Sequence, residues 1–291
     1  MKKIDRKYDK GILVGKCPDR VGIITYLTKW FAEHSGNILE LDQHVDRSTG
    51  EFFIRIEWDM EGFDISRTDF PALFGKGVAT PLSMKWDLAY SGDRPRIAIF
   101  VSQLSHCMWD IISRWQSGEW NVEIPLIIGN HSDFESTALR FGCKFRHVPI
   151  SAETKTEQEK KELALLRDLK IDFIVLARYM QILSGDFVSQ YSNRIINIHH
   201  SFLPAFAGAN PYQRAHERGV KLIGASAHYV TPELDEGPII QQDTVEVSHR
   251  DSVEDLIRKG RDVEKIVLSR AIYLHINKRI AVHGKRTVIF S

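Results

Sequence analysis

Apolar positions in the first 88 residues follow the order strand, helix, strand, strand, helix, strand. After Asp19, the expected helix cap, the apolar residues Val21, Ile24, Leu27 and Phe31 recur at helical spacing. The strands expected around this helix are residues 11–16, 38–45, 51–58 and 82–87, and the second helix is residues 70–74. This βαββαβ order predicts a ferredoxin-like domain over residues 1–88.

Residues 89–95 contain Gly92 and Pro95 among charged side chains, which is typical of a linker between domains. Residues 96–291 suffice for one complete core. Expected strands are 96–101, 122–128, 145–148, 172–177, 194–198, 224–230 and 239–247, and expected helices are 105–116, 154–169 and 251–280. Thr154 with Glu157, and Asp251 with Glu254, predict capping boxes for the last two helices. The alternation predicts an α/β protein whose second domain is Rossmann-like, with a mostly parallel sheet.

Composition and charge disfavour several classes of protein. Lys and Arg number 39 against 38 Asp and Glu, a net charge of +1, which argues against nucleic-acid partners and a polybasic membrane anchor. No apolar run approaches the ~20 residues of a membrane span, and no secretory signal follows Lys2 and Lys3. The 3 cysteines form no C-x-x-C pair, which argues against a disulfide framework and a cysteine zinc site. We therefore expect a cytoplasmic protein.

The strand at 194–198 leads into the first candidates for catalysis. Ligands bind at the carboxyl ends of parallel strands, and period-two alternation places Asn197 and His199 on one face, opposite Ile198. Downstream, Asp235 stands two residues before Gly237, in a loop that can close tightly over a site. An amide donor, an imidazole and a carboxylate are suited to acyl transfer without a protein nucleophile, because they can hold an oxyanion and move a proton.

Several neighbouring residues leave alternatives open. His228 is either a core histidine bonded to the backbone or a site residue, and His200 points away from the face of His199 unless the strand ends there. His199, His228 and Asp235 could supply three zinc ligands, although their spacing matches no compact zinc motif. Cys107, at a helix start, could be a nucleophile, but an ordinary small residue is the favoured interpretation.

Two motifs carry these residues: NIHHSFLPAFAGANP from residue 197 and SAHYVTPELDEGPIIQQ from residue 226. They resemble the folate-dependent formyltransferase and hydrolase superfamily through Asn-x-His before SxLP and Asp-x-Gly before an I-I-x-Q strand. The N-terminal stretch GKCPDRVGIITYLTKWFAEHSGNI resembles an ACT domain. An ACT domain fused to this core resembles the formyltetrahydrofolate deformylase family, as do the doubled histidine and GRDVEKIVLSRAIY. The resemblance extends from about Gly11 to Phe290.

The resemblance implies that Asn197, His199 and Asp235 hydrolyse 10-formyltetrahydrofolate to formate and tetrahydrofolate, without a metal or other cofactor. This reaction would supply formate for purine synthesis and balance one-carbon folate pools. The folate would be held by backbone groups after the 172–177 strand and by the loop opposite. The substrate-binding residues expected from the resemblance are Met180, Gln181, Ile182, Leu183, His200, His228, Val230 and Gly237.

The turn after the 96–101 strand bears on the formyl acceptor. A phosphorylated amine needs an anion-binding cradle, usually a glycine-rich loop at a helix N-terminus. Residues 102–109 contain no glycine, and we expect Leu104, Met108 and Trp109 to fill the acceptor site and so favour water. The alternatives are a formyltransferase acting on an unphosphorylated amine, such as an amino sugar, and a non-catalytic regulator that senses folate or an amino acid.

The ACT resemblance also implies a small amino-acid effector, such as glycine or methionine, bound between paired domains. Asp19, Gly22 and Asn37 match the places where ACT domains bind such ligands. A domain that only dimerises fits the sequence equally well. Either way, we expect a homo-oligomer, a dimer or tetramer, formed through the ACT domains.

Overall fold

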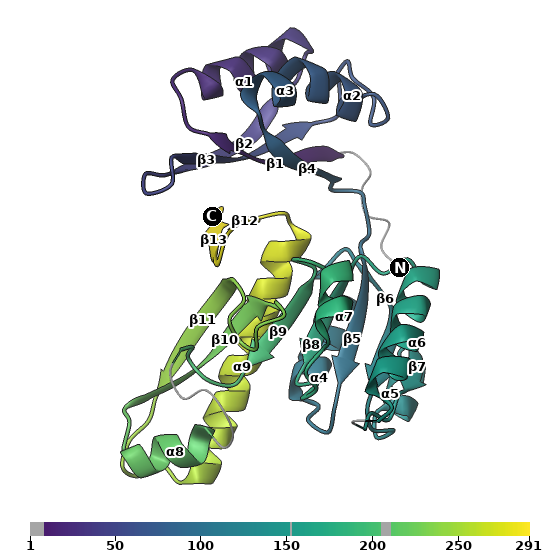
Figure 1. The fold of residues 1–291 in the computed structure, drawn as a ribbon, viewed down its shortest axis with the longest axis vertical. Coiled ribbons are helices and arrows are strands. Elements are labelled where there is room, and N and C mark those ends of the chain that lie inside the picture. The colour runs from purple at the N-terminus through teal and green to yellow at the C-terminus, as the bar shows by residue number, and fades with distance from the viewer. Residues whose placement is uncertain (1–8, 152, 205–210) are drawn as a thin grey trace. The chain divides into compact units, whose positions relative to one another are not determined.

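The computed structural model describes residues 9–151, 153–204 and 211–291, which form two compact units (Figure 1). The first unit runs to Asp93 and also includes residues 274–283 and 287–291. The second comprises residues 94–273 and 284–286. The sequence-based division assigned everything after residue 95 to the second domain, whereas most of the C-terminal hairpin belongs to the first unit. In the described ranges, no helix is long and apolar enough to span a bilayer.

The first unit is a four-stranded antiparallel sheet in the order β2-β3-β1-β4, with its helices on one face (Figure 1). Its elements are β1 (Lys10–Pro18), α1 (Ile23–Glu33), β2 (Ile38–Asp46), β3 (Glu51–Asp59), α2 (Phe70–Phe74), the π-helical turn η1 (Gly75–Ala79), α3 (Thr80–Leu82) and β4 (Lys85–Tyr90). The ferredoxin-like order is confirmed and fits an ACT-like domain. The last strand begins later than expected because the helical segment continues to Leu82.

Helix α1 differs from its prediction at its start. Gly22, not Asp19, is the N-cap, with φ 91° and no side-chain cap. The helix begins at Ile23, and the face it buries includes Leu27 and Trp30. Val21, expected on that face, precedes the helix and is fully exposed, at 103%.

The C-terminal hairpin, β12 (Ile280–His283) and β13 (Arg286–Ile289), joins the first unit through apolar and polar contacts. Phe53 of β3 packs in one buried cluster with Ala281 and Phe290. The buried Arg55 guanidinium donates to the Lys278 carbonyl oxygen at 3.2 Å. Because these partners lie more than 200 residues away along the chain, local patterns could not assign the hairpin to this unit.

The second unit contains a seven-stranded sheet in the order β11-β10-β9-β8-β5-β6-β7. Strands β5 to β9 pair in parallel, while β10 pairs antiparallel with β9 and with β11, which confirms a mostly parallel sheet. Its elements are β5 (Arg96–Val101), α4 (His106–Gln116), β6 (Glu123–Gly129), α5 (Glu135–Arg140), β7 (Lys144–His147), α6 (Lys155–Asp168), β8 (Phe173–Ala177), α7 (Gly185–Gln190), β9 (Ile195–His199), α8 (Pro211–Arg218), β10 (Leu222–Tyr229), β11 (Ile239–Glu246) and α9 (Val253–Ile276).

Two helix caps and one helix end differ from the sequence expectation. Thr154 is the N-cap of α6 but makes no side-chain cap; its hydroxyl instead accepts from the Ser151 amide at 3.0 Å. Before α9 the reciprocal bonds join Ser252 and Asp255, one residue beyond the predicted pair. Helix α9 ends at Ile276, not at residue 280, since β12 begins there.

The strand order places a topological switch point between β5 and β8. From β5 the chain builds β6 and β7 on one side and then β8 and β9 on the other. Val101 and Ala177, the last residues of β5 and β8, are register partners. The turns after these strands therefore open a crevice at the carboxyl edge, where open α/β sheets bind ligands.

Candidate active site

A cavity of about 960 Å³ lies at this carboxyl edge, within the size range of small-molecule sites. It is bounded by the turn after β8, the end of β9, the loop after β10 and residues of α8 and α9. The sequence-predicted residues that line it are Asn197, His199, Asp235, Met180, Gln181, Ile182, Leu183, His200, His228 and Val230. The predicted candidates thus converge, with Gly237 as the exception. Residues 205–210 of the first motif lie outside the described residues.

Four polar side chains form a connected chain in this cavity. The antiparallel register pairs Asn197 of β9 with His228 of β10, and the Asn197 Nδ2 donates to His228 Nε2 at 3.2 Å. Asp235 reaches in from the loop, with Oδ2 3.2 Å from His199 Nδ1 and Oδ1 3.6 Å from His228 Nε2. The carboxylate therefore lies between two imidazoles.

The hydrogen bonds define what each group can do. His228 Nδ1 lies 2.9 Å from the Tyr229 carbonyl oxygen, which fixes a proton on Nδ1 and leaves Nε2 as the acceptor for Asn197 in the neutral ring. The hydrogen bond from His199 is the largest of the causes that hold the pKa of the Asp235 carboxyl well below its usual range. His199 Nε2 is buried and has no hydrogen-bond partner among the residues that the structure describes. Asp235 thus orients the His199 ring through Nδ1, and Nε2 is available to a ligand.

His200 follows the last residue of β9 and turns into the cavity, as the strand-end alternative anticipated. Its ring lies nearly parallel to that of His199, with centroids 5.2 Å apart and an interplanar angle of 21°. Burial, together with the charge of Arg178, lowers the pKa of His200 to about 4. The ring of His200 is therefore neutral near pH 7.

The turn after β8 lines the cavity and has an unusual backbone conformation. Arg178 and Met180 both have φ 61°, in the left-handed region that side chains rarely adopt. Buried carboxylates of α6 hold this turn: Glu162 accepts from the Tyr179 hydroxyl at 3.3 Å, and Glu159 accepts from the Ser184 amide at 2.9 Å. Strained backbone fixed by buried partners is typical of binding sites.

Asp235 also has left-handed backbone, with φ 57°. Gly237, predicted to bind substrate, does not line the cavity. A Cβ at Gly237 would lie 1.7 Å from the Tyr229 carbonyl oxygen, so this position serves the close return of the loop to β10. The structure thus places Gly237 against the backbone of β10 and not at the cavity, contrary to the expected substrate contact.

The expected filling of the acceptor site is only partly correct. Leu104 lines the cavity, but Met108 and Trp109 do not. Met108 is buried on the core face of α4, and Trp109 is 43% exposed with its ring against Phe141. Cys107 is buried, and burial raises the pKa of its thiol, which removes the nucleophile alternative.

Sequence reasoning included Arg178 only as part of the backbone segment after the 172–177 strand, and it missed the polar lining residues of α8 and α9: Tyr212, Gln213, Arg261 and Glu264. One signal was available for Glu264, because a charged residue there interrupts the buried stripe of α9 that contains Gly260, Val263 and Val267. In the described part of the chain, the histidines, cysteines and acids grouped closely enough to share an ion are His106, Cys107 and Glu264. The zinc alternative, which used His199, His228 and Asp235, does not form such a group.

The proposed effector residues lie on the first unit. Asp19, Gly22 and Asn37 are all exposed. The Asp19 amide donates to the Gly50 carbonyl oxygen, and the Asn37 carbonyl oxygen accepts from the Asp59 amide. Their main-chain groups thus support turns of the sheet, and their role toward an effector stays a prediction.

Comparison with known proteins agrees with this site. Residues 95–272 match the formyl transferase family. A formyltetrahydrofolate deformylase from Synechocystis sp. is 53% identical over 96% of this chain and 98% of its own length. The crystal structure of a formyltetrahydrofolate deformylase from Pseudomonas syringae pv. tomato superposes with a TM-score of 0.96 at 42% identity, covering 99% of this chain and 96% of that chain.

The second unit is also similar to a transferase. A glycinamide ribonucleotide transformylase 1 from Symbiobacterium toebii has a TM-score of 0.66 at 32% identity, covering 70% of this chain and 98% of that chain. The deformylase relatives, by contrast, match both units over nearly their whole length. The chain therefore belongs to the formyl transferase family and, within it, to the formyltetrahydrofolate deformylases.

Proposed function

We propose that this protein hydrolyses 10-formyltetrahydrofolate to formate and tetrahydrofolate at the cavity of the second unit. The observation that carries the proposal is the pairing of His199 Nδ1 with Asp235 at a cavity that also holds the Asn197 amide. His199 Nε2 is buried there without a partner in the described part of the chain. This arrangement provides two donors for a developing oxyanion and a carboxylate for the attacking water.

His199 and Asn197 stabilise the tetrahedral intermediate. The formyl oxygen gains negative charge as water adds, and the His199 imidazolium can donate to it through Nε2–H. The Asn197 amide has a second N–H beyond the one directed at His228. Loss of one such donor costs about 3–4 kcal/mol of barrier in comparable sites. Asp235 Oδ2 lies 3.2 Å from His199 Nδ1 and so orients the ring with Nε2 toward the reacting oxygen.

Asp235 receives the proton that the water loses. Its low pKa makes it a weak base toward a resting water, but the acidity of the water rises sharply as its oxygen bonds to the formyl carbon. The bond from that carbon to N10 then breaks while N10 takes up the proton that Asp235 received, which regenerates the carboxylate. The products are tetrahydrofolate and formic acid, which ionises to formate, so every atom of the water is accounted for.

The substrate is a large, flat ring system with a polar edge, which suits the turn after β8. Arg178 and Met180 have left-handed backbone within residues 178–183, which line the cavity together with Val230. We propose that these backbone groups bind the pterin edge and that Met180, Gln181, Ile182 and Leu183 cover its faces. No metal or cofactor enters the proposed steps.

The decisive experiment measures formate release from 10-formyltetrahydrofolate in amine-free buffer. Equal amounts of formate and tetrahydrofolate are expected, at a rate that added amino sugars do not raise. A protein that released formate only when an amine was present, or formylated the amine instead, would be a transferase. Tight folate binding without turnover would indicate a non-catalytic regulator that senses folate.

The first unit is proposed to bind a small amino acid such as glycine or methionine near Asp19, Gly22 and Asn37, and to pair with a second copy of the chain. The three cysteines are free and buried, which suits work in the reducing cytoplasm. Thermal unfolding and mass measurement with and without each amino acid test these points. An unchanged melting temperature with both would remove the effector proposal.

A further inference from the structure

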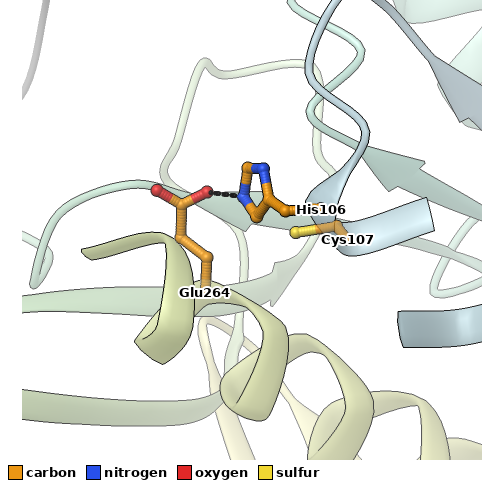
Figure 2. Close-up of side chains that lie close together, drawn as sticks. All are labelled: His106, Cys107 and Glu264. Carbon is orange, nitrogen blue, oxygen red and sulfur yellow. Dashed lines mark hydrogen bonds and ion pairs between the residues drawn. The ribbon is translucent and has the colours of Figure 1, made fainter. Parts of the chain in front are cut away.

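A second buried polar cluster lies at the cavity and takes no part in the proposed steps. The carboxylate of Glu264, on α9, is 1% exposed and has three partners. His106 Nε2 lies 2.7 Å from its Oε2, the Tyr212 hydroxyl donates to its Oε1 at 2.8 Å, and Arg178 Nε lies 3.5 Å from Oε2. Figure 2 shows the His106 ring directed from the start of α4 to this carboxylate, with Cys107 beside it.

The charges in this cluster are unfavourable for a metal ion. His106, Cys107 and Glu264 offer ligand atoms within 4.8 Å of one another. However, the Arg178 guanidinium already lies against the Glu264 carboxylate, so a divalent ion there would have a positive charge as its neighbour. Burial also raises the pKa of the Cys107 thiol, which disfavours the thiolate that metals bind.

The position of Glu264 in the fold suggests a different role. Helix α4 follows β5 at the switch point of the sheet, and its N-terminus is the kind of place where α/β proteins bind phosphate. The carboxylate of Glu264 lies against the first two residues of that helix, His106 and Cys107. Burial raises the pKa of Glu264, but the hydrogen bond from His106 and the charge of Arg178 outweigh it, so the group is ionised.

We propose that Glu264 is a built-in anion at the start of α4, which excludes amines that carry a phosphate monoester from the acceptor side of the cavity and leaves water as the formyl acceptor. The inference rests on the proposed hydrolysis and assigns a specificity-determining residue for it. A phosphate dianion at the start of α4 would meet the buried carboxylate of Glu264 or would have to displace it. The Arg178 guanidinium, which could otherwise bind the phosphate, already pairs with Glu264.

The cluster is also costly for stability, which argues for a functional reason. Arg178 is 8% exposed, and within the described ranges its Nε and Nη1 make an ion pair at most and no hydrogen bond. Buried ion pairs with unsatisfied donors are poor sources of stability compared with apolar packing. Gly260 is adapted to the cluster as well, since a Cβ there would lie 2.1 Å from the Tyr212 hydroxyl oxygen.

The test compares phosphate binding by the wild type and by Glu264→Gln, with ribose 5-phosphate as the probe in the formate-release assay. The wild type is expected to resist competitive inhibition. Glu264→Gln removes one negative charge and frees Arg178, so the probe should bind at least about tenfold more tightly. Glu264→Asp keeps the charge and should resist the probe like the wild type.

Two controls separate charge from packing. Glu162→Gln removes another buried carboxylate that accepts from a tyrosine, but on α6, and should leave phosphate affinity at the wild-type level. Gly260→Ala displaces Tyr212 while keeping the charge of Glu264, and should also leave the affinity for ribose 5-phosphate at the wild-type level.

The wild type is expected to resist ribose 5-phosphate. Competitive inhibition of the wild type by this probe therefore overturns the proposal, even if Glu264→Gln does not fold. A folded Glu264→Gln protein that binds ribose 5-phosphate no more tightly than the wild type overturns the proposal as well. Amine-free formate release by the wild type tests the hydrolase function separately, so the two failures are distinguishable.

Discussion

Replacing Gly237 with alanine perturbs the loop that carries Asp235 without removing any polar group. The new Cβ would lie 1.7 Å from the Tyr229 carbonyl oxygen, whereas ordinary contacts begin near 3.4 Å. The contact is with backbone, so no side-chain rotation can relieve it. The loop and β10 must separate by more than roughly 1 Å, well beyond what the interior of a packed protein absorbs freely.

The separation acts on three interactions of the site at once. Tyr229 donates its amide to the Pro238 carbonyl oxygen and accepts from His228 Nδ1, while Asp235 lies 3.2 Å from His199. A misplacement of about 1 Å costs on the order of 100-fold in rate, which is about 2.7 kcal/mol of barrier. Folate binding should change much less, because the turn after β8 lies on another element.

The assay is steady-state formate release by Gly237→Ala beside Gly185→Ala. Gly185 faces the same loop, but a Cβ there would meet the Pro232 Cβ at an ordinary 3.9 Å, so this control should stay within about twofold of the wild type. A kcat of Gly237→Ala equal to that of the control, in a protein with an unchanged melting temperature, would refute the reasoning that this glycine places Asp235.

Other predictions concern stability and metal. Burial raises the pKa of Glu162 from 4.5 to about 7, so the folded state holds a proton that the unfolded state releases, and stability falls as pH rises between those values. In urea unfolding, the free energy of unfolding of Glu162→Gln should rise relative to that of the wild type by up to about 3 kcal/mol between pH 4.5 and 8. A difference between the two proteins that does not change with pH would exclude the raised pKa. Chelator-treated protein should keep full activity, and activity lost to chelation and regained with Zn²⁺ would establish a metal role.

The sequence was sufficient where the chemistry depends on local geometry. Period-two alternation correctly placed Asn197 and His199 on one face, because β9 is a regular strand that reaches His199. The role of His228 could not be decided, since it depends on the antiparallel register that sets it opposite Asn197. It is in fact both buried and part of the site, so the two interpretations were not exclusive.

The errors in the sequence analysis have physical causes that differ. Trp109 was placed in the site although helical spacing puts it away from the face that buries Met108 and Ile111, a fact that periodicity could have supplied. Glu264 could not be connected with His106, because 158 residues separate them and only the packing of α9 near the start of α4 brings them together.

The turnover of Asp235→Asn tests the catalytic centre most directly. The variant keeps the shape of the side chain but loses the base and the charge that pairs with His199. In amine-free buffer it is predicted to bind tetrahydrofolate like the wild type and to release formate at least about 100-fold more slowly. Formate release at a near-wild-type rate by a folded Asp235→Asn protein would contradict the assignment of Asp235, and with it the proposed mechanism.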